Sequence, residues 1–330
     1  MSAPLRIVYV AGNGRSGSTL LDRMLGQMPG AISLGEVRFL YEFGLQEEHL
    51  CECGAVVRAC PFWGPVVHAA LGPVSPERAR ELARQSRRLL WTPALPRLLG
   101  WPTGAAFRKL RDEHAAAAGR LYRAIAERSG ATWLVDSSKL AAYAFLLARV
   151  PGLELHVVHL VRDSRAVAFS WQRTRVKPEV AARRALMPVR PPLLTALRWN
   201  GHNLLARALA RAARSHVRVR YEDLVRAPAR TLANVADALG MERAELGFVG
   251  DGAVELRRGH SVAGNPSRFQ SGRVPLRLDE EWRRAMPRFN RALVTLLTLP
   301  QLLAYGYGTR TRPTALSDDG ATREEGVAHG

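Results

Sequence analysis

Long apolar runs are missing from this sequence of 330 residues. The longest candidate for a membrane span, residues 292–305, is short and contains Pro300, so a core helix is the favoured interpretation. The N-terminus has neither the basic region nor the cleavage site of a secretory signal. We therefore expect a cytoplasmic protein that does not insert stably into a membrane.

Lysine is also scarce, since Lys109, Lys139 and Lys177 are the only three among 48 basic residues. The formal net charge of +19 favours an anionic partner, such as a phosphorylated ligand, a nucleic acid or a membrane surface. The arginines are dispersed, however, and no aromatic and basic pattern typical of a single-strand binder is present. The charge thus supports a small anionic ligand, and we expect no nucleic-acid partner.

Cysteine occurs only three times, at Cys51, Cys53 and Cys60, and His49 precedes the first of them by two residues. Thiolate and imidazole are the preferred ligands of zinc, so these four residues could bind one ion. The spacing is not a standard one, however. The alternative is a cysteine-bearing loop, reduced or with one disulfide, and we expect the chain's activity to require no metal.

A phosphate-binding loop without its lysine lies at residues 12–19. Its spacing is that of the nucleoside-triphosphate P-loop, but Ser18 stands where that loop has the lysine that reaches the β- and γ-phosphates. An apolar strand pattern precedes it and a helical pattern follows it. Backbone N–H groups and a helix N-terminus in this context favour an anion. The loop therefore predicts a phosphate site that does not need a γ-phosphate.

Alternating strand and helix patterns predict an α/β fold with crossover helices. One helical pattern begins at Ser75–Pro76. Three others span residues 112–129, 140–149 and 228–239. The strand patterns are short, apolar and flanked by turn residues, as in a buried parallel sheet. They cover residues 5–11, 31–35, 132–136, 155–161 and 217–221.

We expect one domain over residues 1–308, with a helical insert at about 64–130 and a flexible loop at about 174–192. The loop is rich in proline and arginine. Residues 309–330 are small, polar and charged, and we expect them to form a disordered tail.

Three further segments follow predicted strands, at the edge where open α/β sheets bind ligands. They are residues 135–139, 160–170 and 220–224. Together with the phosphate-binding loop they bring Arg15, Lys139, Arg162 and Arg165 towards one edge. A strongly cationic rim is the expected result.

These segments resemble the motifs of the PAPS-dependent sulfotransferases. Residues 15–21 (RSGSTLL) resemble the 5′-phosphosulfate loop of that family, and residues 162–170 (RDSRAVAFS) resemble its 3′-phosphate loop. Residues 221–224 (YEDL) are similar to a segment that follows a later strand in that family. Residues 264–269 (GNPSRF) are similar to a segment of its bacterial members. The resemblance covers most of residues 5–307. It implies a P-loop-like, three-layer α/β fold, in which helices flank a parallel sheet of about five strands.

The resemblance also implies which residues bind the donor PAPS and the product PAP. A nucleotide with phosphates at its 5′ and 3′ positions needs no Walker lysine, because it has no γ-phosphate. Arg162 and Ser170 would bind the 3′-phosphate, Tyr221 would lie beside the adenine, and Arg268 would complete the phosphate contacts. The 5′-phosphate would be held by Arg15, Ser16, Gly17, Ser18 and Thr19.

Glu36, at the end of the second predicted strand, is the candidate general base for the sulfonyl acceptor. The alternatives are a structural carboxylate paired with an arginine such as Arg38, or a histidine base, for which His260 is a weaker candidate. Lys139 could stabilise negative charge on the leaving oxygen or the sulfonyl group. Ser138 could donate a hydrogen bond to the sulfonyl group or cap the next helix.

Two other functions remain open on the sequence. One is a P-loop kinase or NTPase, against which Ser18 argues. The other is a basic, non-catalytic binder of nucleic acid or membrane surfaces, which rests on charge alone. The sequence does not identify the sulfonyl acceptor, which is a small molecule, a lipid or a carbohydrate. Residues 49–101 and 174–192 are expected to cover it.

Overall fold

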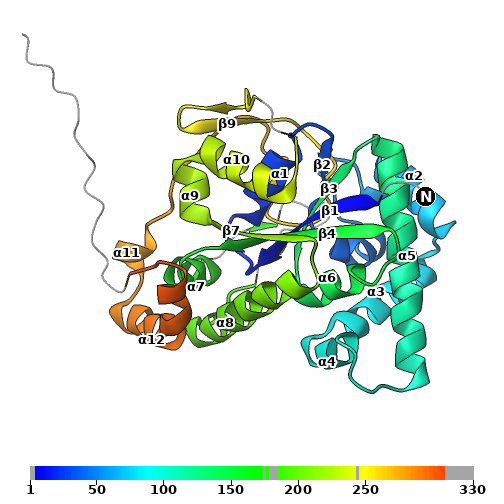
Figure 1. Cartoon of the computed structure of the whole chain (residues 1–330), viewed down its shortest axis with the longest axis horizontal. Coiled ribbons are helices and arrows are strands. Elements are labelled where there is room, and N and C mark those ends of the chain that lie inside the picture. The colour runs from blue at the N-terminus through cyan, green and yellow to red at the C-terminus, as the bar shows by residue number, and fades with distance from the viewer. Residues whose placement is uncertain (1–3, 174–175, 178–184, 187, 243–244, 309–330) are drawn as a thin grey trace, which may run out of the picture.

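A five-stranded parallel sheet forms the centre of the computed structural model, which describes residues 4–173, 176–177, 185–186, 188–242 and 245–308 (Figure 1). All four neighbouring pairs in this sheet are parallel. The sheet contains every strand that the sequence predicted, so the predicted α/β class is confirmed. In spatial order its strands are β2 (Ala31–Ser33), β3 (Trp133–Lys139), β1 (Leu5–Gly12), β4 (Leu153–Val161) and β7 (Ser215–Arg220).

The central strand β1 is buried on both faces, which explains its nearly continuous apolar sequence. Because side chains alternate along a strand, Ile7 and Tyr9 join one apolar cluster while Val8 and Val10 join another. The sheet is therefore the middle of three layers.

One face of the sheet is covered by α1 (Ser18–Leu25) and α10 (Pro228–Leu239), with α9 (Tyr221–Arg226) beside them (Figure 1). Leu21 and Leu232 are fully buried in this layer. As predicted, α10 begins at a proline and ends at Gly240, whose φ of 71° suits a glycine C-cap.

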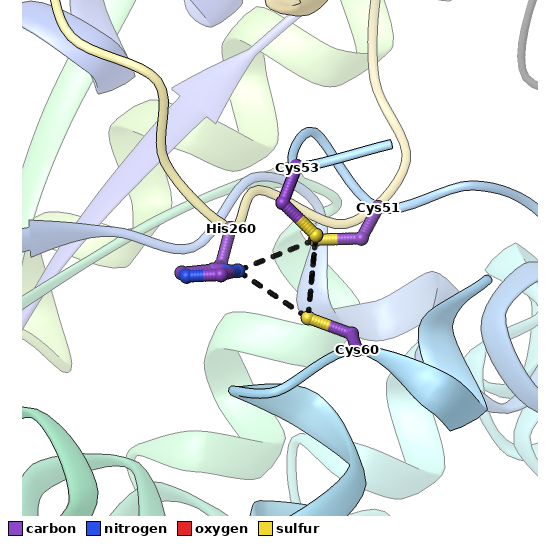
Figure 2. Close-up of side chains that lie close together, drawn as sticks. All are labelled: Cys51, Cys53, Cys60 and His260. Carbon is purple, nitrogen blue, oxygen red and sulfur yellow. Dashed lines mark hydrogen bonds between the residues drawn. The ribbon is translucent and has the colours of Figure 1, made fainter. Parts of the chain in front are cut away.

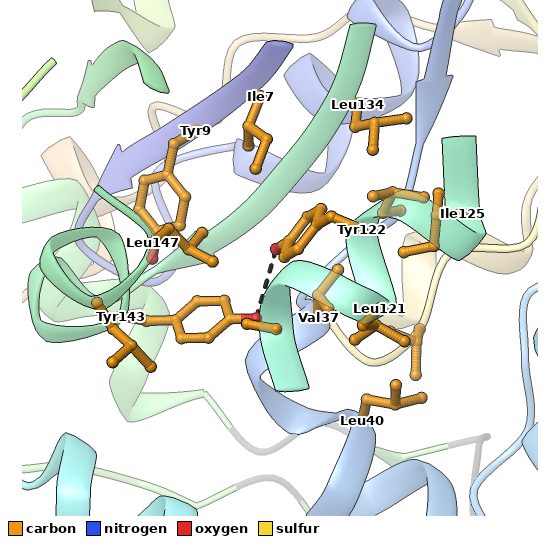
Figure 3. Packing of buried hydrophobic residues seen from close by; sticks show 14 of the residues in the cluster. Ile7, Tyr9, Val37, Leu40, Leu121, Tyr122, Ile125, Leu134, Tyr143 and Leu147 are labelled. Carbon is orange, nitrogen blue, oxygen red and sulfur yellow. Dashed lines mark hydrogen bonds between the residues drawn. The ribbon is translucent and has the colours of Figure 1, made fainter. Parts of the chain in front are cut away.

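The other face is covered by α5 (Ala105–Ser129), α6 (Ala141–Leu147) and α8 (Pro192–Ala208). Figure 3 shows Tyr122 and Tyr143 meeting beneath β1, where their hydroxyl groups lie 3.4 Å apart. Burial raises the pKa of both hydroxyls well above the ordinary value, so both stay protonated. The Tyr122 hydroxyl donates to the Asp136 carboxylate, which connects this layer to β3.

The segment between β2 and β3 is mainly helical. As the sequence predicted, Ser75 caps a helix there, because its side chain accepts a hydrogen bond from the Arg78 N–H. The helix predicted at 112–129 begins earlier, since Phe107 and Leu110 also pack against the apolar cluster. The other elements of this segment are η1 (Val37–Phe39), η2 (Leu40–Gln46), η3 (Val57–Ala59), α2 (Trp63–Leu71), α3 (Pro76–Leu90), η4 (Thr92–Ala94) and α4 (Leu95–Leu98).

A second, antiparallel sheet near the C-terminus was not predicted from the sequence. Its strands are β8 (Val249–Gly250), β9 (Ala253–Leu256) and β10 (Gly272–Pro275), too short to give a readable alternation. The C-terminal region also contains η6 (Pro266–Phe269), α11 (Trp282–Ala285) and α12 (Arg288–Ala304). Earlier in the chain, α7 (Ser164–Gln172) precedes α8 and η5 (Leu209–Arg211) follows it.

Helix α12 contains the longest apolar run of the sequence, and it is amphipathic. Val294 and Leu302 are buried, whereas Phe289 and Leu296 are largely exposed. The described part of the chain contains no helix whose length and apolar composition would suffice to cross a bilayer. Within the loop predicted at 174–192, β5 (Val176–Lys177) pairs with β6 (Ala185–Leu186). Most of the rest of this loop lies outside the described residues, and so does the tail predicted at 309–330.

Candidate active site

The loop between β1 and α1 turns sharply because two glycines adopt backbone conformations that residues with side chains rarely adopt. Gly12 has a φ of 136°, and Gly17, with a φ of 88°, caps α1. A Cβ atom on Gly17 would collide with the Tyr221 ring. Arg15 also has a positive φ, of 70°, although it carries a side chain. The loop is thus held in a tight turn at the N-terminus of α1.

Hydrogen-bonding groups are buried in this loop. The Ser16 hydroxyl and the Asn13 amide nitrogen have no hydrogen-bond partner among the described residues, although both side chains are almost fully buried. Buried donors normally have partners. Two such groups at a helix N-terminus therefore fit an anionic ligand, and Ser18 and Thr19 begin the helix beside them.

Arg162, directly after β4, reaches this loop. Its Nη1 donates to the Arg15 carbonyl oxygen over 3.1 Å, and its guanidinium lies 4.5 Å from the centre of the Tyr221 ring. Its Nη2 lies 3.4 Å from a carboxylate oxygen of Asp279. The structure thus brings the two predicted phosphate loops into contact, while Ser170 is buried further along the same segment, on α7.

Arg165 does not extend the predicted cationic rim. Its guanidinium pairs with the Asp163 carboxylate, over 2.7 Å from Nη2 to Oδ2, and lies 4.8 Å from the centre of the Trp282 ring. Asp163 also caps α7 by accepting from the Arg165 N–H. Arg165 therefore fixes the start of α7, and the expectation that it faces the anion site is wrong.

Glu222 has a structural role that the sequence analysis missed. Its carboxylate accepts from the Asp163 N–H over 3.2 Å and from the Tyr307 hydroxyl over 2.6 Å. Burial raises the pKa of this carboxyl above the ordinary value. Within the YEDL segment, Tyr221 packs on the phosphate loop while Glu222 holds the Arg162 loop in place.

Glu36 and Lys139 lie together where the ends of β2 and β3 meet. Lys139 Nζ is 2.7 Å from Glu36 Oε1 and also donates to the Ser137 carbonyl oxygen over 2.9 Å. Lys139 has a φ of 65°, an uncommon conformation for a residue with a side chain. The side chain that pairs with the Glu36 carboxylate is thus Lys139 rather than Arg38, and both charged groups are nearly buried.

Ser138 is fully buried below this pair. Its hydroxyl donates to the Asp136 carboxylate over 2.5 Å and accepts from the Arg38 N–H over 3.1 Å. Burial raises the pKa of Asp136 to about 6. Helix α6 has Leu140 at its N-cap and no side-chain cap, so the predicted capping by Ser138 is wrong. These hydrogen bonds make Ser138 a support for the turn that carries Lys139.

The opposite side of Glu36 is closed by two segments far apart in the sequence, residues 49–63 and 257–270, which we call the clasp. Glu52 accepts from the Ser261 N–H and hydroxyl and pairs with Arg23 over 3.0 Å, all within the protein interior. The Glu36 N–H donates to the Val262 carbonyl oxygen over 2.8 Å. The clasp is therefore connected directly to the candidate base.

Arg268 belongs to the clasp. It is 0% exposed, and its Nη2 donates to the Leu50 carbonyl oxygen over 2.9 Å. This contact joins the two segments of the clasp. Nearby, the Asn265 N–H donates to Thr19 Oγ1 over 3.3 Å, so the clasp also touches the phosphate loop.

The three cysteines of the clasp lie together, but His49 does not join them. His49 pairs with Glu47 over 3.0 Å and stacks on Phe43, with the ring centres 4.9 Å apart. His260 takes the place that the sequence analysis gave to His49: its Nδ1 and the three sulfur atoms all lie within 4.8 Å of one another. The histidine of the predicted zinc set is thus corrected to His260.

His202, on α8, is a site candidate that the sequence analysis did not find. Burial, followed by the charges of Arg198 and Arg38, lowers its pKa to about 4, and Lys139 contributes in the same direction. Its imidazole is therefore neutral at pH 7. Its Nδ1 is buried without a hydrogen-bond partner among the described residues, so it can hydrogen-bond a ligand, but the same cations make it a poor proton acceptor.

A cavity of about 420 Å³ opens among α2, α3 and α5. Its walls include Tyr41, Leu82, His114, Ala116 and Arg120. A smaller space shares Tyr41 and His114 with it and extends to Val37 and Arg38, the residues that follow Glu36. Glu36 itself lines neither space, and the smaller one approaches it only through Val37 and Arg38.

The sequence matches the model of the sulfotransferase family over residues 8–245. Among solved structures, the fold is similar to the sulfotransferase domain from the Synechococcus PCC 7002 olefin synthase, with a TM-score of 0.53 and 22% identity. That match covers 94% of this chain and 98% of the other. The sulfotransferase domain from the curacin biosynthetic pathway has a TM-score of 0.50 and 19% identity, covering 93% and 100%. No curated protein matches significantly.

Proposed function

The chain belongs to the sulfotransferase family, and we propose that it transfers the sulfonyl group of PAPS to a hydroxyl or amine of a small-molecule, lipid or carbohydrate acceptor. The observation that carries this proposal is the contact of Arg162 with the phosphate loop. Two anion-binding segments that meet in this way suit one nucleotide with a phosphate at each end of its ribose.

The donor would be bound mainly by the phosphate loop. The buried Ser16 hydroxyl supports this assignment, as do the N–H groups at the start of α1. Arg162 and Ser170 would bind the 3′-phosphate, and Tyr221, already packed on Gly17, would lie beside the adenine. Residues 15–19 would hold the 5′-phosphate. We leave Arg268 out of this set, because its buried guanidinium serves the clasp.

The reaction would be an in-line displacement on sulfur. The acceptor oxygen or nitrogen forms a bond to sulfur, the bond from sulfur to the 5′-phosphate oxygen breaks, and the acceptor proton goes to Glu36. The position of Glu36 at the end of β2, 2.7 Å from Lys139 and beside the clasp, supports this role. The leaving group departs as PAP.

Lys139 would stabilise negative charge that develops on the leaving oxygen. Its unusual backbone conformation is held by the Ser138 N–H and hydroxyl bound to Asp136, which makes Ser138 a positioning residue in this proposal. No metal enters these steps. We also treat residues 1–308 as one catalytic domain, with 64–130 as its helical insert.

The body of the acceptor would occupy the cavity among α2, α3 and α5. A volume of about 420 Å³ is suitable for a small organic molecule, and the walls combine apolar residues with Arg78, Arg120 and Glu113. The smaller space beyond Tyr41 and His114 is lined by Arg38 but holds only about 20 Å³, so it would have to widen for the acceptor hydroxyl to reach Glu36.

Calorimetry with PAP, without added Mg²⁺, tests the donor assignment. We expect PAP to bind and ATP with Mg²⁺ to bind far more weakly. Preferential binding of ATP with Mg²⁺ would instead favour the kinase or NTPase alternative, while binding of RNA or anionic vesicles without PAP binding would favour a non-catalytic role.

Incubation of a cell extract with PAPS and the protein then tests the transfer. Mass spectrometry should find molecules that gain one SO₃ group and that are absent when PAPS is omitted. A protein that binds PAP but yields no such product with any extract would contradict the proposed acceptor class.

A further inference from the structure

Four potential metal ligands converge inside the clasp, as Figure 2 shows. Cys51 and Cys53 lie in the turn before η3, Cys60 lies at its end, and His260 follows β9. The Cys60 sulfur is 3.6 Å from each of the other two sulfurs. The His260 Nδ1 lies 3.3 Å from the Cys60 sulfur and 3.8 Å from the Cys51 sulfur.

These distances match the edges of a tetrahedron around zinc. Zn–S bonds of about 2.3 Å and a Zn–N bond of about 2.0–2.1 Å place two sulfurs about 3.8 Å apart and a sulfur and nitrogen about 3.6 Å apart. The four edges given above lie within about 0.3 Å of these values. Hydrogen bonding among three thiols does not require a histidine nitrogen at the fourth corner.

We propose that Cys51, Cys53, Cys60 and His260 bind one zinc ion as a closed structural site. The cysteines would bind as thiolates, so their three protons leave as the ion enters, and His260 would bind through Nδ1 as a neutral imidazole. Three sulfurs and one nitrogen select zinc over the hard cations Mg²⁺ and Ca²⁺.

The surroundings hold the ligands in place without a metal. The His260 ring stacks on the Phe62 ring, with the ring centres 5.2 Å apart. The backbone carbonyl oxygen of His260 accepts a hydrogen bond from the Trp63 indole N–H. The Gly54 N–H donates to the Cys51 carbonyl oxygen over 2.9 Å, and the φ of 92° at Gly54 permits the tight turn between Cys51 and Cys60. A preformed set of this kind gives specific binding at low cost in ordering.

The ion would fasten the two segments of the clasp to each other. His260 is followed directly by Ser261, which is bound to Glu52, and by Val262, which is bound to Glu36. The zinc site therefore adds a further connection at the position where the clasp meets the candidate base. This inference rests on the clasp geometry and does not depend on the proposed sulfonyl transfer.

The test is the metal content of the full chain, purified without a histidine tag and under reducing conditions. We expect elemental analysis to find about one zinc per chain. Replacement by Co²⁺ should give the visible bands of tetrahedral cobalt and the near-ultraviolet bands of cobalt–thiolate bonds. Thiol reagents should modify all three cysteines only after a chelator has removed the metal.

Two histidine variants distinguish the ligand set. His260→Asn should reduce zinc occupancy at least about tenfold or shift the cobalt spectrum, while His49→Asn, the matched control, should keep both. Cys53→Ser provides a second variant at a partly exposed position. Loss of metal in His49→Asn but not in His260→Asn would overturn the assignment.

The wild-type chain alone can also refute the proposal. A reduced protein that contains no zinc and takes up no Co²⁺ with thiolate bands would refute it. A mass two hydrogens lower under non-reducing conditions, with no metal bound, would show a disulfide in its place.

Discussion

Two walls of the candidate active site are built in opposite ways. The first, which we call the phosphate wall, comprises residues 12–19, 162–170 and Tyr221, each placed directly after a strand of the same parallel sheet. The second wall is the clasp, whose two segments are separated by about 200 residues. It is held by side chains, such as Glu52 with Ser261, which are 209 positions apart.

Because of this difference, the polar groups of the phosphate wall can contact a ligand, whereas those of the clasp contact other parts of the protein. The sheet orders the phosphate wall, so polar groups there are left for an anion, as the Ser16 hydroxyl illustrates. In the clasp, by contrast, Glu52 and Arg268 are buried and directed at other parts of the chain, Glu52 at Arg23 of α1 and Arg268 at Leu50. Substitutions in the phosphate wall should therefore weaken binding, while those in the clasp should lower the free energy of unfolding.

Glu36, where the two walls meet, should show the largest effect. The change Glu36→Gln keeps the shape but removes the proton acceptor, so kcat should fall about 10²–10⁴-fold. The affinity for PAP, measured by calorimetry, should stay within about threefold, since the phosphate wall is unchanged. If kcat stays near the wild-type value, Glu36 is not the base.

Glu52→Gln tests the clasp. Breaking its buried pair with Arg23 should lower the free energy of unfolding by about 3–5 kcal/mol, measured by urea denaturation. The folded fraction should still bind PAP with an affinity close to wild type. A variant of normal stability but weak PAP binding would reverse the division of roles between the walls.

Arg162→Ala tests the phosphate wall in the same two assays. Loss of charge-assisted contacts to a phosphate should weaken PAP binding about 100-fold or more, while unfolding changes little. Arg226→Ala, an exposed arginine on α9, is the matched control and should leave both quantities unchanged. Normal PAP affinity in Arg162→Ala would remove this residue from the 3′-phosphate site.

Ala116→Trp should have the smallest effect and should involve neither wall. Ala116 is an exposed residue that lines the cavity, so a tryptophan there should raise the KM for the acceptor about tenfold. Ala106→Trp, on the same helix but outside the cavity lining, is the control. Steady-state kinetics with the acceptor identified by mass spectrometry would show an unchanged KM if the acceptor binds elsewhere.

The phosphate wall could be predicted from the sequence because its information is local. A run of apolar residues, a glycine-rich turn and a helix pattern follow one another within residues 5–25, and the sheet then brings the ends of β1 and β4 together. Family resemblance added the pairing of this loop with residues 162–170. Arg165 was placed wrongly, since its neighbour Asp163 neutralises it within the same turn.

The clasp could not be predicted in the same way. His49 is close to the cysteines in sequence, but in space it turns to Glu47 and Phe43, and His260 arrives from beyond β9. Glu222 and His202 were missed for a related reason: the YEDL segment does not show that Glu222 binds Asp163 and Tyr307 in other elements, and His202 belongs to no spacing pattern. Tertiary contacts of this kind leave no trace in local periodicity.

The separation between Cys51 and His260 also has a consequence for the order of folding. These residues are 209 positions apart, and the strands β3, β4 and β7 lie between them in the chain. During synthesis the cysteines emerge long before their histidine. The four-ligand set is therefore complete only after His260 has been synthesised, so binding of the metal by all four ligands would report a long-range contact rather than a local one.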